Sequence, residues 1–148
     1  MTKQETDGSA VETITDKDGN LYQVEREEED DILCINVVWK QTIVGFAQCI
    51  FYSDGGMLLD DLIIFKVARI KYPFISFLKR EQSFRGLGLG SQVLRLVIAE
   101  AERRQVRRIY GVIKGEEGNE AFSLPDWYRR HGFTVVDDER FYRNLFPM

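Results

Sequence analysis

Histidine, cysteine and proline are scarce in this chain of 148 residues. It contains one histidine (His131), two cysteines (Cys34 and Cys49) and three prolines. One histidine excludes a site with several histidine ligands, and the cysteine spacing fits no metal motif, so we expect no metal. Each cysteine lies in an apolar, strand-like run, and we expect buried free thiols rather than a disulfide.

Long apolar runs and an excess of positive charge are also missing. No apolar stretch approaches 18 residues and no basic-then-apolar leader stands at the N-terminus, so we expect a cytoplasmic protein with no membrane partner. The net charge is −4, so there is no overall basic field to attract nucleic acid. We expect a disordered polar tail over residues 1–10 and a single domain over residues 11–148.

A glycine-rich turn before an amphipathic helix is the central motif. Residues 84–90 read F-R-G-L-G-L-G, and apolar side chains follow at helical spacing, which predicts a helix from about Gly90 to Arg104. The first turn of a helix has backbone N–H groups without partners and the positive end of the helix dipole. Because glycine lets an anion approach the backbone closely, the motif predicts a phosphate or pyrophosphate cradle.

The spacing of the glycines discriminates between phosphate ligands. A P-loop requires a lysine that is missing after Gly90, and the dinucleotide fingerprint requires G-x-G-x-x-G, whereas the order here is G-x-G-x-G. The order R-x-x-G-x-G, with Arg85, Gly88 and Gly90, resembles the acyl-CoA-binding motif of the GCN5-related N-acetyltransferase (GNAT) superfamily. The resemblance implies that acetyl-CoA is the co-substrate. The cofactor-binding residues that it implies are Leu78, Arg80, Arg85, Gly86, Leu87, Gly88, Leu89, Gly90, Ser91 and Asn119.

A second motif lies at residues 128–133, which read Y-R-R-H-G-F. It is similar to the Y-x-x-x-G-F ending of the last conserved helix of the superfamily. The resemblance implies that Tyr128 donates a proton to the departing CoA thiolate, a role that a phenol within hydrogen-bond reach can fill. The alternative is a half-buried aromatic residue that anchors a short helix. We expect His131 to pack at the end of this helix rather than to take part in catalysis.

The expected fold class is α/β (α+β), with the GNAT-like acyl-CoA N-acyltransferase fold. The resemblance implies a mixed, mostly antiparallel central sheet flanked by helices. Alternating apolar runs predict hairpins over residues 11–25 and 32–51, a strand over 57–65, and later strands near 109–114, 133–136 and 140–143. No helical segment lies between the first strands, so the N-terminal helices of the family are reduced or absent. Either residues 57–65 or residues 74–79 could lead into the glycine turn.

Two adjacent carboxylates interrupt the apolar strand at residues 57–65. Asp60 and Asp61 are our candidates for the general base that removes a proton from an acceptor amine. A carboxylate inside an apolar strand is unfavourable unless a partner or a function compensates for its burial. Glu81, Glu116 and Glu117 are further candidates, and a satisfied structural pair is the alternative. On a regular strand, Asp60 and Asp61 would point to opposite faces. The tetrahedral oxyanion would be met by a strand backbone N–H group.

The implied activity is direct transfer of an acetyl group from acetyl-CoA to a primary amine of a small molecule or peptide. A non-catalytic CoA-binding or interaction module on the same fold is the alternative, and another phosphate-ligand protein is a third possibility. The acidic run Glu25–Asp31 is expected to be a solvated turn, or else to attract a cationic substrate. The arginines of residues 103–108 are expected to be solvated, with a nucleic acid or the 3′-phosphate of CoA as the alternatives. Exposed strand edges would allow a homodimer.

Overall fold

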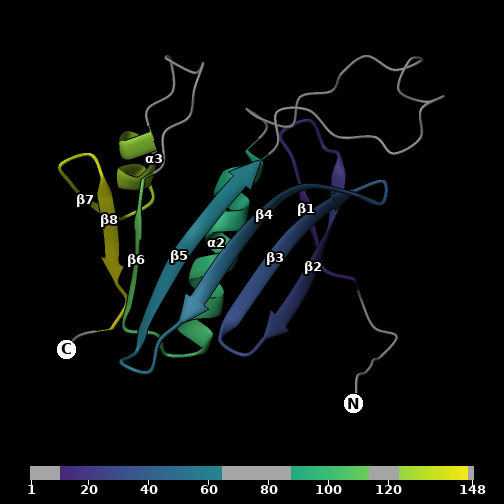
Figure 1. Cartoon of the computed structure of the whole chain (residues 1–148). Coiled ribbons are helices and arrows are strands. Elements are labelled where there is room, and N and C mark those ends of the chain that lie inside the picture. Colours follow the sequence, from purple (N-terminus) through teal and green to yellow (C-terminus); the bar gives the residue numbers. More distant parts are fainter. Residues whose placement is uncertain (1–10, 65–87, 114–123, 147–148) are drawn as a thin grey trace.

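The computed structural model describes residues 11–64, 88–113 and 124–146, and these residues form one eight-stranded sheet with two helices (Figure 1). In chain order, the elements are β1 (Thr13–Thr15), β2 (Leu21–Glu29), β3 (Ile32–Trp39), β4 (Thr42–Phe51), β5 (Gly56–Ile64), α2 (Leu89–Arg103), β6 (Arg108–Val112), α3 (Leu124–Arg130), β7 (Thr134–Val136) and β8 (Arg140–Asn144).

The first five strands form an antiparallel meander, as the alternating apolar runs predict. Tight turns join them, and no helix lies within residues 11–64, so the prediction of missing N-terminal helices is confirmed for that part of the chain. The prediction of a solvated turn over Glu25–Asp31 is wrong for most of the run. Glu25–Glu29 belong to β2, and only Asp30 and Asp31 form the turn, where Asp30 takes a left-handed backbone with φ 55°.

The sheet changes direction between β5 and β6, its only parallel neighbours among the described strands. The strand order is β1-β2-β3-β4-β5-β6-β8-β7, and β5 pairs with β6 only over Gly56–Leu58 and Arg108–Tyr110. The remaining pairs, β6 with β8 and β7 with β8, are antiparallel. The mixed, mostly antiparallel sheet expected from the sequence is therefore confirmed, and β5 is the last described strand before α2.

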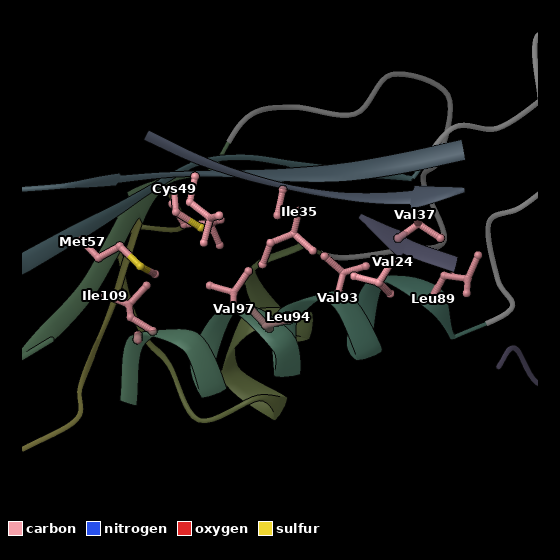
Figure 2. Packing of buried hydrophobic residues seen from close by; sticks show 14 of the residues in the cluster. Val24, Ile35, Val37, Cys49, Met57, Leu89, Val93, Leu94, Val97 and Ile109 are labelled. Atoms are coloured by element: carbon pink, nitrogen blue, oxygen red, sulfur yellow. The ribbon is translucent and has the colours of Figure 1, made fainter. Parts of the chain in front are cut away.

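The core lies between the sheet and α2, which covers one face of the meander (Figure 1). In Figure 2, Val24, Ile35, Val37 and Cys49 point from the strands toward the helix. The apolar face of α2 that meets them consists of Leu89, Val93, Leu94, Val97 and Ala101, which are all buried. Since burying one Val or Leu side chain stabilises a fold by roughly 1.5–3 kcal/mol, this face is the main reason the segment folds as a helix here.

The two cysteines form no disulfide in the described fold. Cys49 is buried, Cys34 is partly exposed, and both are free thiols; burial raises the pKa of Cys49 to about 12. Within the described residues, no group of three or more His, Cys, Asp or Glu side chains could hold a metal ion. The described helices are too short or too polar to cross a bilayer.

Candidate functional site

The start of α2 is shaped as an anion cradle. Gly88 is the N-cap residue, and its φ of 85° lies in the left-handed region that favours glycine. No side chain caps the helix, and its first turn contains no acidic residue. The first N–H groups of a helix have no partner within it, so those at Leu89, Gly90 and Ser91 surround a region of positive potential.

Three elements meet at this cradle. A Cβ atom on Gly90 would lie 3.5 Å from Cζ2 of Trp127 in α3 and 3.8 Å from Cγ1 of Ile64 at the end of β5. The Ser91 hydroxyl lies 3.0 Å from Nε2 of His131, and Nδ1 of the same ring lies 2.8 Å from the carbonyl oxygen of Trp127. The cradle therefore opens beside the end of β5, and His131 joins α2 to α3.

Tyr128 lies in the aromatic core beneath α3. Its ring stacks on Phe141 with centroids 4.0 Å apart and meets the edges of Trp127 and Phe133. The side chain is only 7% exposed. Burial raises the pKa of the Tyr128 phenol, and the negative charge of Asp61 raises it further. The raised pKa means that the phenol is protonated at neutral pH and is a weaker acid than an exposed tyrosine.

A β-bulge in β5 places the two candidate carboxylates. Gln48 of β4 pairs with Asp61, whereas the next residue, Cys49, pairs with Leu59, so Asp60 is the extra residue. The Gln48 side-chain amide donates a hydrogen bond of 3.1 Å to Asp60. A bulge breaks the regular alternation of a strand, so the expectation that Asp60 and Asp61 point to opposite faces, which assumed a regular strand, stays a prediction. Both carboxylates are partly exposed.

Several sequence-predicted site residues lie outside the described residues. These are Leu78, Arg80, Arg85, Gly86, Leu87 and Asn119, together with the alternative carboxylates Glu81, Glu116 and Glu117. The described members, Gly88, Leu89, Gly90 and Ser91, lie together at the start of α2. The roles of Tyr128, Asp60 and Asp61 remain predictions.

Sequence reasoning missed the contribution of the first hairpin. The side chain of Gln92 donates a hydrogen bond to the backbone carbonyl of Thr15, and Lys17 of the β1–β2 turn lies against Gly88. The lysine stands in an ordinary Asp-Gly turn sequence about 70 residues before the glycines. No local pattern in the sequence indicates that the two turns meet.

The arginines of residues 103–108 lie at the far end of α2 from the cradle. A helix of 15 residues is roughly 22 Å long, so this run is badly placed for the 3′-phosphate of a ligand bound at Gly88. The expectation of solvated charges is wrong for Arg104, whose guanidinium lies 2.7 Å from Glu28 and 2.6 Å from Glu100. Arg108 stacks over the ring of Tyr142.

The described fold is a mixed sheet with a glycine cradle beside the carboxyl end of β5, at the opposite end of that strand from the residues that pair with β6. The profile of the acetyltransferase (GNAT) family matches residues 4–133. The chain therefore belongs to the GNAT family. A search of curated proteins found no match.

Solved structures share the fold at low sequence identity. The PaiA N-acetyltransferase of Thermoplasma acidophilum, in complex with coenzyme A, is 15% identical with a TM-score of 0.55; the match covers 78% of this chain and 62% of that longer one. A GNAT acetyltransferase of Elizabethkingia anophelis with bound acetyl-CoA is 12% identical, with a TM-score of 0.55 and coverages of 78% and 77%. A Bacillus subtilis acetyltransferase in complex with CoA is 10% identical, with a TM-score of 0.57 and coverages of 84% and 99%.

Proposed function

We propose that this chain is an acetyl-CoA-dependent N-acetyltransferase that transfers the acetyl group directly to a primary amine. The observation that carries the proposal is the uncapped, acid-free start of α2 at Gly88, beside the end of β5 and α3. Family membership and the neighbours solved with CoA or acetyl-CoA support it.

The cradle fits the pyrophosphate of CoA. A Cβ atom on Gly90 would make an ordinary van der Waals contact with the Trp127 ring, at 3.5 Å, so a side chain there would occupy part of the space beside the first turn. The N–H groups of Leu89, Gly90 and Ser91 would hold the phosphate oxygens, because they carry partial positive charge and have no partner within the helix. Bound CoA would supply the acetyl thioester.

The residues around the end of β5 would move the protons. The neutral amine nitrogen forms a bond to the acetyl carbon while the carbon–sulfur bond breaks, and the amine loses one proton. We assign that proton to Asp60 or Asp61, whose bulged segment lies on β5, the strand that ends beside the cradle. Tyr128 would donate to the thiolate; since its raised pKa makes it a weak acid, we expect it to act late, as negative charge develops on sulfur.

A thermal-shift titration tests the cradle. Any ligand that binds only the folded state raises the unfolding temperature. We expect acetyl-CoA and CoA to raise it and ATP and NAD to leave it unchanged. A protein that does not respond to saturating CoA would contradict the proposal.

Replacing Tyr128 by Phe tests the acid, and an amine screen that detects free thiol supplies the assay. We expect Tyr128→Phe to lower kcat by roughly 10²–10⁴-fold, the usual contribution of a general acid, with unchanged CoA affinity. Tyr142→Phe is the matched control, because that partly exposed phenol lies on β8 away from the cradle. Wild-type turnover in Tyr128→Phe would remove the phenol from the mechanism, and CoA binding without turnover of any amine would favour a non-catalytic CoA-binding module.

A further inference from the structure

The turn between β1 and β2 lies directly against the glycine turn of α2. A Cβ atom on Gly88 would be 3.7 Å from Cγ of Lys17, so the aliphatic part of the lysine runs beside the N-cap. The Gln92 side chain, in the first turn of α2, donates a hydrogen bond to the backbone carbonyl of Thr15. Two contacts thus join the hairpin to the start of this helix.

The hairpin turn is held in place by a buried carboxylate. Asp16 is 6% exposed and accepts hydrogen bonds from the backbone N–H groups of Asp18 (2.9 Å) and Asn20 (3.0 Å). It also accepts one from the Asn20 side-chain amide (3.1 Å) and one from the hydroxyl of the fully buried Tyr22 (2.7 Å). The Asp16 carboxylate is therefore hydrogen-bonded within the turn, and these hydrogen bonds fix the backbone at Lys17.

The charge of Lys17 has no protein partner in the described part of the chain. Its side chain is exposed, and no ion pair or hydrogen bond joins its ammonium group to residues 11–64, 88–113 or 124–146. The Cγ atom of Lys17 nevertheless lies beside the N-cap of α2, the positive end of the helix dipole, where an acidic side chain would normally be favoured. A cation at this position is unfavourable by itself and becomes favourable when an anion lies between it and the helix.

We propose that Lys17 binds a phosphate group of the CoA molecule held at the start of α2, so that the first hairpin contributes to the cofactor site. The inference rests on the proposed function. Under this proposal, the positive charge of Lys17, which lies outside the glycine motif, acts together with the backbone N–H groups to bind the phosphate. An ammonium group is a compact, mobile partner for phosphate oxygens.

Isothermal titration of CoA into wild-type protein, Lys17→Ala and Lys17→Arg tests this assignment, with Lys40→Ala as the matched control. Lys40 is also an exposed lysine in a hairpin turn, but it lies over the Trp39 ring in the β3–β4 turn. We expect Lys17→Ala to weaken CoA binding by roughly fivefold to thirtyfold at low salt, toward the low end for a hydrogen bond to a charged group because Lys17 is exposed. Lys17→Arg and Lys40→Ala should remain near wild type, and the loss should shrink at high salt.

A parallel titration of 3′-dephospho-CoA identifies the phosphate. If Lys17→Ala also weakens binding of this ligand, the lysine contacts the pyrophosphate; if wild type and variant bind it equally, the lysine contacts the 3′-phosphate. Both results support the proposal. Equal CoA affinity of wild type and Lys17→Ala would overturn it and leave the proposed function intact. A wild-type protein that binds no CoA would overturn both.

Discussion

The imidazole of His131 has a single neutral tautomer compatible with its neighbours. A carbonyl oxygen can only accept, so Nδ1 must carry the proton that it donates to Trp127 O. In the neutral ring, Nε2 is then an acceptor, and the Ser91 hydroxyl donates to it. The Ser91 hydroxyl proton is therefore turned toward α3, so at the proposed cradle Ser91 would offer a ligand only its backbone N–H group.

This geometry predicts a weak effect of Ser91→Ala on CoA binding. The backbone N–H persists in the variant, and the lost hydroxyl donates to His131, so we expect the dissociation constant to change by less than about threefold, below the value of one typical hydrogen bond. Nitrogen-15 NMR of the histidine ring should show the Nδ1–H tautomer in the wild type. A loss of CoA affinity above tenfold, or an Nε2–H tautomer, would contradict the assignment.

Single residues of the site were predictable where the local chain determines their role. The glycine-rich turn before α2 was expected from the local sequence, and Gly88 in that turn has a left-handed backbone with φ 85°. Lys17 was not predictable, because its position beside Gly88 depends on the docking of a distant hairpin. The bulge at Asp60 was equally hidden, since nothing in M-L-L-D-D-L-I-I indicates an extra residue in the ladder.

At the scale of elements, the approach of β5 to β6 depends on Gly111. A Cβ atom there would lie 2.4 Å from Cζ of Phe141 and 2.8 Å from the backbone oxygen of Leu59. The first contact involves a buried ring and the second a backbone atom, so neither can yield easily. Glycine at this position lets three strands lie close together at the edge of the junction.

We therefore expect Gly111→Ala to lower the free energy of unfolding by about 1–3 kcal/mol, the usual cost of forcing a methyl group into a packed core. Urea denaturation measures it. Val112→Ala is the control, because the neighbouring Val112 side chain is 56% exposed and its truncation should cost little. Equal stability of Gly111→Ala and wild type would mean that β5 and β6 can separate at no cost.

The elements themselves followed closely from hydrophobic periodicity. Residues 90–104 were expected as a helix, and α2 covers Leu89–Arg103; residues 32–51 were expected as a hairpin, and β3 and β4 form it. Their order in the sheet was not derivable from periodicity, because the parallel pairing of β5 with β6 joins segments about 50 residues apart. The family resemblance supplied only the expectation of a mixed, mostly antiparallel sheet.

For the molecule as a whole, an ion-pair network ties strand β2 to the helix. Glu100 of α2 is 7% exposed and pairs with Arg26 of β2 at 2.9 Å and with Arg104 at 2.6 Å. Arg104 reaches back to Glu28 of β2 at 2.7 Å. Burial alone would raise the pKa of Glu100, but hydrogen bonds and charges from Arg103 and Arg104 outweigh it and lower the pKa below its usual value.

Glu100→Gln should lower the free energy of unfolding by about 1–3 kcal/mol at pH 7, because the arginines lose a buried partner although they remain partly solvated. A lowered pKa in the folded state means that the stabilisation is complete above the unfolded pKa, about 4.3, and is lost as the pH falls through the folded value. Urea denaturation of both proteins between pH 7 and pH 3 should therefore show the difference shrinking in acid. Glu102→Gln, at an exposed position of the same helix, should match wild type; a difference that grows in acid would contradict the sign.

The short contact between β5 and β6 has a consequence for the time course of folding. The meander β1–β5 joins neighbours in sequence, and such local contacts form quickly because little loop entropy is lost. Three residue pairs between Gly56–Leu58 and Arg108–Tyr110 must then join that half to β6–β8 across about 50 residues. Since α3 belongs to the second half, the glycine turn and Tyr128 are assembled into one site only when this slow, long-range step is complete. We therefore expect binding of the proposed cofactor, CoA, to develop only at the end of folding.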